Sequence, residues 1–226
     1  MPSLTRSDLV TRVGELINDP NHTRWSTSQK QERVEEAQER FVVDTRCLIN
    51  SSSTSVVAGT AEYSLPTDIL DIERVTHNGI ELTRMSKADF DFYTNRNWAS
   101  DQGRPERYYV DLDPDNKKIG LYPKPQAADA GSSNLIIDYV QIPTELSSDS
   151  STPFNSHTLL TPYHMAIVYW AAKELLNADM TPENQVKARQ YMKEYEDLVA
   201  HCVNLFRSMK QSSPMRLKGG RYYKGL

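Results

Sequence analysis

Three histidines and one aspartate are the side chains whose types and spacing could support metal binding or acid–base chemistry. They are His157, His164 and His201, with Asp197 four residues before His201 and therefore on the same face of a helix. No second pair with ligand spacing accompanies them, and the Glu-x-x-His repeats of a metal site in a helical bundle are absent. Surface or capping roles are therefore favoured, and we expect no metal and no cofactor.

A group of glutamates could be read as a pair of catalytic carboxylates of the kind that glycosidases use. Glu35, Glu36 and Glu39 are close in sequence, but Arg33 and Arg40 lie beside them and the pattern is that of a solvated helix face. The sequence also lacks Gly-x-Ser-x-Gly, a glycine-rich phosphate loop and Cys-x-x-Cys. We expect no catalytic residue and no enzymatic activity.

The C-terminus differs from the rest of the chain in charge. From Arg207 to Leu226 there are six Lys and Arg and no Asp or Glu, which leaves 20 Lys and Arg against 30 Asp and Glu upstream, or −10. The last part, Pro214 to Leu226, is too rich in glycine and too poor in aliphatic side chains to bury a face of its own, so we expect an extended tail that orders on binding. Its cations would steer a partner and its apolar side chains would fill pockets. The predicted docking residues are Met215, Arg216, Leu217, Lys218, Arg221, Tyr222, Tyr223 and Lys224. The alternative is a solvated terminus.

Composition narrows the class of protein. The chain has 226 residues, enough for one core with an inserted subdomain, and its two cysteines, Cys47 and Cys202, fit helical patterns better as buried thiols than as a disulfide. A sequence pI near 5.8 argues against a body that grips duplex DNA. No apolar run approaches a membrane span or a signal peptide, so we expect no membrane association.

Helical periodicity occurs at both ends of the chain. The first predicted helix runs from about Ser7 to Asn18 with Thr5 or Ser7 as its cap, and the second carries Val34, Ala37, Phe41 and Leu48 at helical spacing. Later, Thr161-Pro162 predicts the start of a buried helix, and Thr181-Pro182 predicts another. That last helix shows a continuous seam of Tyr191, Tyr195, Leu198, Cys202, Leu205 and Met209, which is more typical of packing inside its own domain than against another subunit.

Strand and turn signals replace the helical period between about Thr54 and Glu145. Asn78-Gly79 predicts a type I′ turn, Ser86-Lys-Ala-Asp89 predicts a short helix through Tyr93, and further apolar runs predict antiparallel strands. The tyrosines of these strands could stack nucleic-acid bases, but few cations accompany them, so sheet packing is favoured. They are Tyr108, Tyr109, Tyr122 and Tyr139.

The predicted fold class is therefore α+β. Residues 1–50 and 157–210 form a discontinuous helical bundle with two N-terminal and two long C-terminal helices. Residues 54–145 form a small inserted antiparallel β module, and residues 211–226 form an extended docking tail.

Several short sequence segments, taken in their order along the chain, resemble those of the head-to-tail adaptor (head completion, connector) proteins of tailed bacteriophages. The phrases that carry the likeness are Trp25 before the second helix, Tyr63-Ser-Leu-Pro-Thr-Asp68 leading into Ile72-Glu-Arg-Val75, Asn78-Gly79 with Ile80-Glu-Leu82, Gly103-Arg-Pro-Glu-Arg-Tyr-Tyr109, Ile119-Gly-Leu-Tyr-Pro-Lys-Pro125, Leu135 to Pro143, and Pro162-Tyr163-His164. The tail matches none of these motifs.

The resemblance implies a structural virion protein at the head–tail junction, assembled in the host cytoplasm. Its implied partners are the portal protein, neighbouring adaptor subunits in a ring of about twelve, and a downstream tail or nozzle protein. DNA would pass through the channel without specific binding. Two other classes stay open: a nucleic-acid-binding module that uses the basic tail, and a cell-wall hydrolase.

Overall fold

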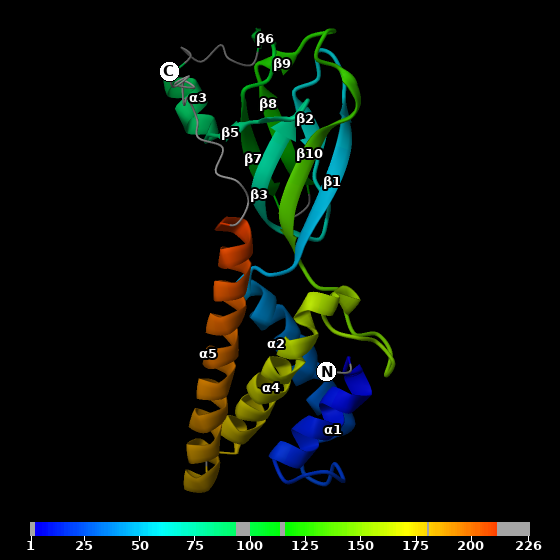
Figure 1. Cartoon of the computed structure of the whole chain (residues 1–226), viewed down its shortest axis with the longest axis vertical. Helices are drawn as coiled ribbons and strands as arrows, with labels where there is room; N and C mark the ends of the chain where they lie inside the picture. Colours follow the sequence, from blue (N-terminus) through cyan, green and yellow to red (C-terminus); the bar gives the residue numbers. More distant parts are fainter. Residues whose placement is uncertain (1–2, 94–99, 114–115, 180, 212–226) are drawn as a thin grey trace, which may run out of the picture. The chain divides into compact units, whose positions relative to one another are not determined.

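The chain folds into a helical unit and a β unit. The computed structural model describes residues 3–93, 100–113, 116–179 and 181–211, so the predicted tail from residue 212 onward, with all of its proposed docking residues, lies outside the described part. The helical unit combines Met1–Cys47 with Pro143–Leu226, and the β unit is the single continuous segment Leu48–Ile142 (Figure 1).

The first two helices begin at reciprocal caps that the sequence encodes locally. Helix α1, Arg6–Leu16, is capped by Thr5, whose hydroxyl accepts from the backbone of Asp8 while the Asp8 carboxylate accepts from the Thr5 backbone. Helix α2, Thr27–Thr45, has the same box between Ser26 and Gln29.

Both helices end earlier than the sequence pattern predicted. Asn18 has φ +57° and Arg46 has φ +53°, and residues in this left-handed conformation cannot continue a right-handed helix. Cys47 and Leu48 are therefore buried in the chain that follows α2 rather than on the helix itself.

The buried helix after the β unit starts differently from the prediction. Thr161 and Pro162 lie within a 3₁₀ segment, Thr158–Tyr163, and α4, His164–Ala178, begins after Tyr163 without a side-chain cap. A proline with φ near −65° fits a 3₁₀ turn as well as the first turn of an α-helix, so this signal does not separate the two.

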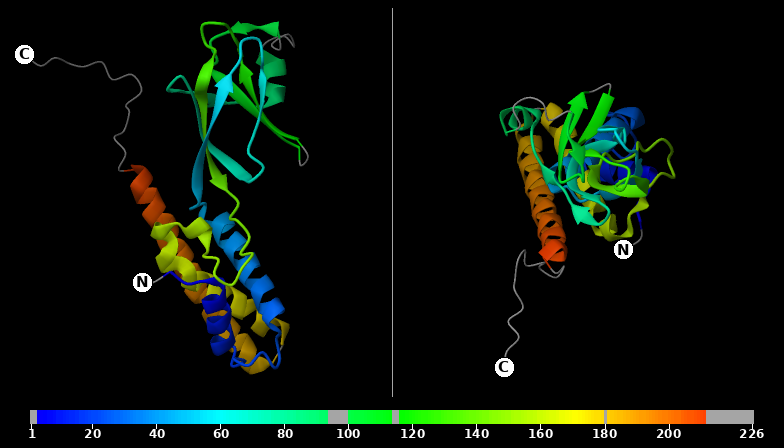
Figure 2. Two further views of the ribbon diagram at one scale, coloured as in Figure 1. Left: turned by 90° about the vertical axis from the view of Figure 1, so that its right-hand side faces the viewer. Right: turned by 90° about the horizontal axis from the view of Figure 1, so that it is seen from above.

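Helix α5, Pro182–Gln211, begins at the predicted residue. Thr181 accepts from the backbone N–H of Asn184 through its hydroxyl, and Pro182 occupies the first helical position. Helices α4 and α5 pack along each other, and α4 also packs on α1 and α2, as Figures 1 and 2 show from three sides. The core between them is fully buried and includes Val13, Phe41, Ile167, Ala171 and Cys202.

Within its described residues, the β unit has two four-stranded sheets and one short pair of strands. The first sheet has the order β1-β10-β3-β4 and the second β2-β8-β7-β5, with β6-β9 apart. The strands are β1 Ile49–Val56, β2 Glu62–Ser64, β3 Ile69–His77, β4 Ile80–Glu81, β5 Thr83–Arg84, β6 Gln102–Gly103, β7 Arg107–Asp113, β8 Asn116–Tyr122, β9 Lys124–Pro125 and β10 Gly131–Gln141. Pairing is antiparallel, as predicted, except for the two-residue pairs β5–β7 and β6–β9, which are parallel.

The inner faces of the two sheets share one apolar core. Ile72, Val75, Leu135 and Ile137 from the first sheet pack with Ile119 and other buried side chains from the second. This is the arrangement of two sheets packed face to face. The predicted hairpin is present at β3–β4, where Asn78 and Gly79 both have positive φ, as a type I′ turn requires. The predicted short helix is α3, Lys87–Tyr93, capped by Ser86 and Asp89.

Strand structure begins at Ile49, five residues before the predicted start at Thr54. Strand β1 lies at the edge of its sheet and pairs only with β10 within the described chain. Because Ser51 to Ser53 cover no core, the strand shows no alternation of apolar and polar residues that a sequence pattern could detect. The fold class is α+β, with helices on both sides of the β segment in sequence.

Candidate assembly surface

Helix α5 is the element that carries the basic C-terminal segment. Its last described side chains are increasingly exposed: Leu205 and Phe206 are half-buried, Arg207 is exposed and Met209 is 46% exposed. The docking residues predicted from the sequence follow after Gln211 and lie outside the described residues, so their role stays a prediction.

Three tyrosines fix α5 on the other helices of its unit. Tyr191 donates to the backbone carbonyl of Leu16 at 3.2 Å, and Tyr195 donates to Asp44 at 2.8 Å. The Tyr163 hydroxyl from the start of α4 lies 2.9 Å from Nδ1 of His201. Tyr195 and Cys202 of the α5 seam are both buried, so between these two residues the seam packs inside its own unit. The base of the C-terminal segment is thereby held on a packed helix.

The candidate metal-binding or catalytic side chains have separate environments. His157 is exposed, His201 contacts Tyr163, and His164 is buried with its Nδ1 accepting from the backbone N–H of Leu4 at 3.1 Å. Burial lowers the pKa of His164 to about 4, which keeps the ring neutral and able to accept that bond. Among the described residues no group of three or more His, Cys, Asp or Glu could hold a metal ion.

The glutamates considered as a carboxylate pair are partners of arginines or exposed to solvent. Glu35 lies 3.6 Å from the guanidinium of Arg6, Glu36 pairs with Arg33 within its own helix, and Glu39 is exposed. This is the arrangement of a charged helix face, on which such pairs contribute little to stability.

The tyrosines of the β unit pack within the sheets, as the sequence favoured over base stacking. Tyr108, Tyr109 and Tyr139 are at most 4% exposed, and the half-buried Tyr122 donates to Asp101 at 3.0 Å. Tyr109 lies over Gly120 of β8 and donates to Glu62 of β2 at 2.9 Å. These side chains connect neighbouring strands and present no stacking platform.

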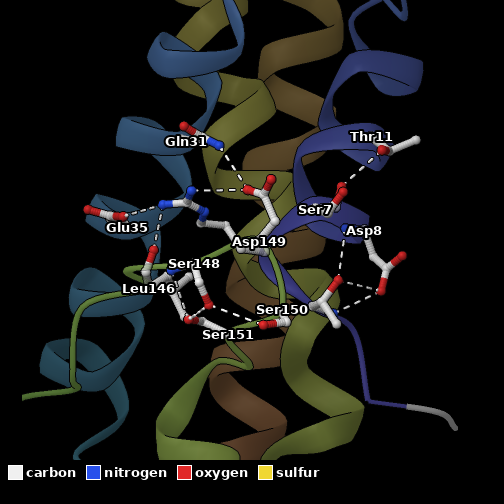
Figure 3. Close-up of polar contacts among 12 residues, drawn as sticks. Ser7, Asp8, Thr11, Gln31, Glu35, Leu146, Ser148, Asp149, Ser150 and Ser151 are labelled. Atoms are coloured by element: carbon white, nitrogen blue, oxygen red, sulfur yellow. Dashed lines mark hydrogen bonds and ion pairs between the residues drawn. The ribbon is translucent and has the colours of Figure 1, made fainter.

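No local pattern in the sequence predicts how the segment that follows the β unit is held on helices α1 and α2. Arg6 donates to the carbonyl of Leu146 at 2.5 Å and to Asp149 at 3.0 Å, while its backbone N–H donates to Ser151 at 2.8 Å. Figure 3 shows Asp149 also within reach of Gln31 on α2, at 3.3 Å, and the serines around it bonded to one another. Because Leu146, Asp149 and Ser151 lie 140 to 145 positions from Arg6 in the sequence, no local pattern could predict this contact.

A second contact that no local sequence pattern predicts is a buried ion pair between α1 and α2. The side chains of Asp19 and Lys30 are 4% and 0% exposed and lie 3.1 Å apart. Backbone N–H groups of Thr23, Arg24 and Trp25 also donate to Asp19, and these bonds, that from Trp25 above all, lower the pKa of its carboxyl. The loop that contains Trp25 is therefore fixed by a fully satisfied buried charge.

A comparison with protein families identifies the class to which these elements belong. The family model described as SU10 adaptor protein matches residues 4–217, which is most of the chain. The chain belongs to the SU10 adaptor protein family. The likeness inferred from ordered phrases in the sequence, to the head-to-tail adaptors of tailed bacteriophages, is confirmed.

Membership makes this adaptor a structural component of a bacteriophage virion, associated in general terms with portal, tail and other adaptor subunits. The match spans both units and ends at Leu217, so it includes Met215 to Leu217 of the predicted docking residues. No curated protein matches the sequence. Within the described residues, no helix combines the length and the apolar character needed to cross a membrane.

Proposed function

We propose that this adaptor binds beneath the portal at the capsid vertex after DNA packaging, as a ring of about twelve copies that extends the DNA channel and presents a surface to the next tail or nozzle protein. The observation that carries the proposal is the family match over residues 4–217. Assembly takes place in the host cytoplasm, and each copy contacts two neighbours through a heterologous interface that closes by rotation.

The C-terminal segment is the proposed contact with the portal. It follows α5, which Tyr191 and Tyr195 hold on the rest of its unit, so a contact made by the segment transmits force to a packed helix. Its acid-free, Tyr- and Arg-containing sequence suits an extended peptide that folds as it binds, with Tyr222 and Tyr223 as anchors.

The net negative charge of the adaptor favours passage of DNA through the channel over binding of DNA. Each chain carries −4, so twelve copies carry −48, and a channel with acidic walls repels the phosphate backbone. DNA then slides without specific contacts.

The tail is tested by truncation after Ser213. Removing Pro214 to Leu226 takes away no residue of the described core, so the melting temperature should stay within about 2 °C of the full chain while portal binding is lost. Tyr222→Ala with Tyr223→Ala should weaken portal binding about as much as truncation. Lys218→Ala is the matched control inside the tail and should mainly slow association and raise the sensitivity to salt.

Binding is measured with purified portal at two ionic strengths. Full-strength binding by the truncated chain would show that the tail is a passive terminus and that the portal contact lies on the folded units. Salt-dependent binding of DNA by the isolated tail peptide would favour the nucleic-acid module instead. The hydrolase alternative predicts release of soluble fragments from purified cell walls, and Glu35→Gln with Glu36→Gln should abolish that release.

A further inference from the structure

Strand β1 is a long sheet edge along which the described chain places no further strand. Among the described edge strands of the two main sheets, β2, β4 and β5 have two or three residues, whereas β1 has eight (Figure 1). Proteins usually protect an edge with a short strand, a charged residue or a proline, and β1, Ile49–Val56, contains neither a charged residue nor a proline. Its pairing with β10 is regular from Ile49 to Thr54. Such an edge can accept a further strand.

The hydrogen bonds between β1 and β10 determine which backbone groups of β1 point away from the sheet. The N–H of Gln141 donates to the carbonyl of Leu48 at 2.8 Å, which makes these two residues a hydrogen-bonded pair of the antiparallel ladder. Because such pairs alternate with pairs whose backbone groups point away, Ile49, Ser51 and Ser53 direct their N–H and C=O groups outward. The Ser51 N–H agrees with this direction, since it donates to the side chain of the preceding asparagine at 2.8 Å.

The C-terminal segment contains a short sequence with the period of a strand. Met215-Arg-Leu-Lys218 alternates apolar and basic residues, and Gly219-Gly220 separates it from the proposed anchors Tyr222 and Tyr223. It begins four positions after Gln211, the last described residue of α5. Charge favours its meeting with a β unit, because residues 48–142 carry 9 Lys and Arg against 14 Asp and Glu, or −5, and this sequence carries two cations and no acid.

We propose that Met215 to Lys218 of one adaptor copy adds as a strand to the outer edge of β1 in the next copy of the ring. Met215 and Leu217 lie on one face of the extended sheet and the two cations lie on the other. The contact presupposes the ring of the proposed function, and it leaves Tyr222 and Tyr223 free to bind the portal.

This contact has the symmetry that a ring requires. The C-terminal segment and β1 are different surfaces, so the contact is heterologous: each copy donates one strand and accepts one, and the series closes by rotation. Pairing of β1 with β1 of another copy is isologous and stops at two chains. The proposed occupant of the edge is therefore the segment of a neighbouring copy.

The strand contact is too short to assemble free chains, yet it couples chains that a portal holds side by side. Pairing over four residues forms few ladder hydrogen bonds, and each contributes little net free energy. Free chains therefore stay single, whereas copies bound to one portal meet at a much higher effective concentration. The contact thereby makes binding to the portal cooperative.

The first test needs no portal and adds a synthetic peptide of residues 212–220 to the full chain. NMR follows hydrogen exchange of the single amides of β1 with and without about 1 mM peptide. Exchange at Ile49 and Ser53 should slow by at least about twofold, while Asn50 and Ser52, which are bonded to β10, keep their rates. The same peptide with Met215→Asp and Leu217→Asp replaced should change no rate.

Three outcomes of the peptide experiment would overturn the proposal. The first is exchange in β1 that the peptide leaves unchanged. The second is equal slowing of every amide in the strand, because strand addition protects alternate residues. The third is protection of Ile49 and Ser53 in the dilute chain without peptide, which would assign the edge to the chain's own segment.

The second test measures binding of full-length variants to purified portal. Ser53→Pro removes one outward N–H at an edge position that tolerates proline, so half-saturation should need about tenfold more adaptor and binding should lose its cooperativity. Ser53→Thr keeps the N–H and should bind as the wild type does. Met215→Asp with Leu217→Asp changes no described residue and should reproduce the loss even if the proline variant fails to fold.

The two proposals fail in different ways. Cooperative binding of wild-type strength by the Met215→Asp, Leu217→Asp chain would overturn the strand contact and leave the portal proposal intact. If the wild-type chain does not bind portal at all, the proposed function fails, and the peptide experiment still decides whether β1 accepts the segment.

Discussion

The buried ring of His164 makes the helical unit sensitive to acid. Its folded pKa of about 4 lies below the ordinary value of 6.5, so the neutral ring stabilises the fold fully above pH 6.5. As the pH falls from 6.5 to 4 the unfolded chain binds the proton first, and up to about 3 kcal/mol of the free energy of unfolding is lost.

Urea unfolding between pH 7 and pH 4 checks this expectation. His164→Asn keeps an acceptor near the Leu4 N–H and should flatten the extra loss of stability over this range, even though it lowers stability overall. His157→Asn removes an exposed histidine and should leave the pH profile unchanged. If the free energy of unfolding fell equally with pH in the wild type and in His164→Asn, protonation of His164 would not be a cause of the lost stability.

Residues that bond locally could be predicted, and residues that bond across the fold could not. The Ser86–Asp89 cap depends on four consecutive residues, so the local sequence was sufficient to predict it. The Asp19–Lys30 pair and the contacts of Arg6 depend on burial, and an isolated charged residue in a sequence gives no sign of being enclosed.

At the scale of elements, Gly120 sets the close approach of β8 to a side chain from β7. A Cβ at this position would lie 2.0 Å from Cζ of Tyr109, whose ring is 3% exposed and whose hydroxyl is bonded to Glu62. Gly120→Ala should therefore destabilise the β unit by about 3 kcal/mol.

Denaturant unfolding with matched variants separates this clash from a general effect of alanine. Gly103→Ala, in β6, places its Cβ at an ordinary 3.6 Å from Pro123 and should cost less than about 1 kcal/mol. In a Tyr109→Ala background the cost of Gly120→Ala should also fall below about 1 kcal/mol. Equal costs with and without the Tyr109 ring would contradict the assignment.

The elements themselves differ in how clearly the sequence encodes them. The Asn78-Gly79 turn was predictable because only residues that accept positive φ form it. The start of α4 and the start of β1 were misplaced, because Thr-Pro also fits a 3₁₀ turn and because an edge strand of serines carries no apolar alternation.

At the scale of the whole molecule, the order of elements was predictable, whereas the function proposed for this adaptor depends on contacts with other chains. The switch from helical to strand periodicity and back places a continuous β segment between two halves of a helical unit. The predicted docking residues follow α5 and lie outside the described residues, so neither a local pattern nor the packing of the described chain tests what they bind.

The most direct test of the proposed function is electron microscopy of the purified adaptor, alone and mixed with its portal. Because most exposed residues of the described chain are polar or charged and Tyr195 and Cys202 of the α5 seam are buried within their own unit, we expect single chains without portal. With portal we expect a ring of about twelve adaptor copies on one end of each portal ring. Portal rings that keep both ends bare in excess adaptor would contradict the account.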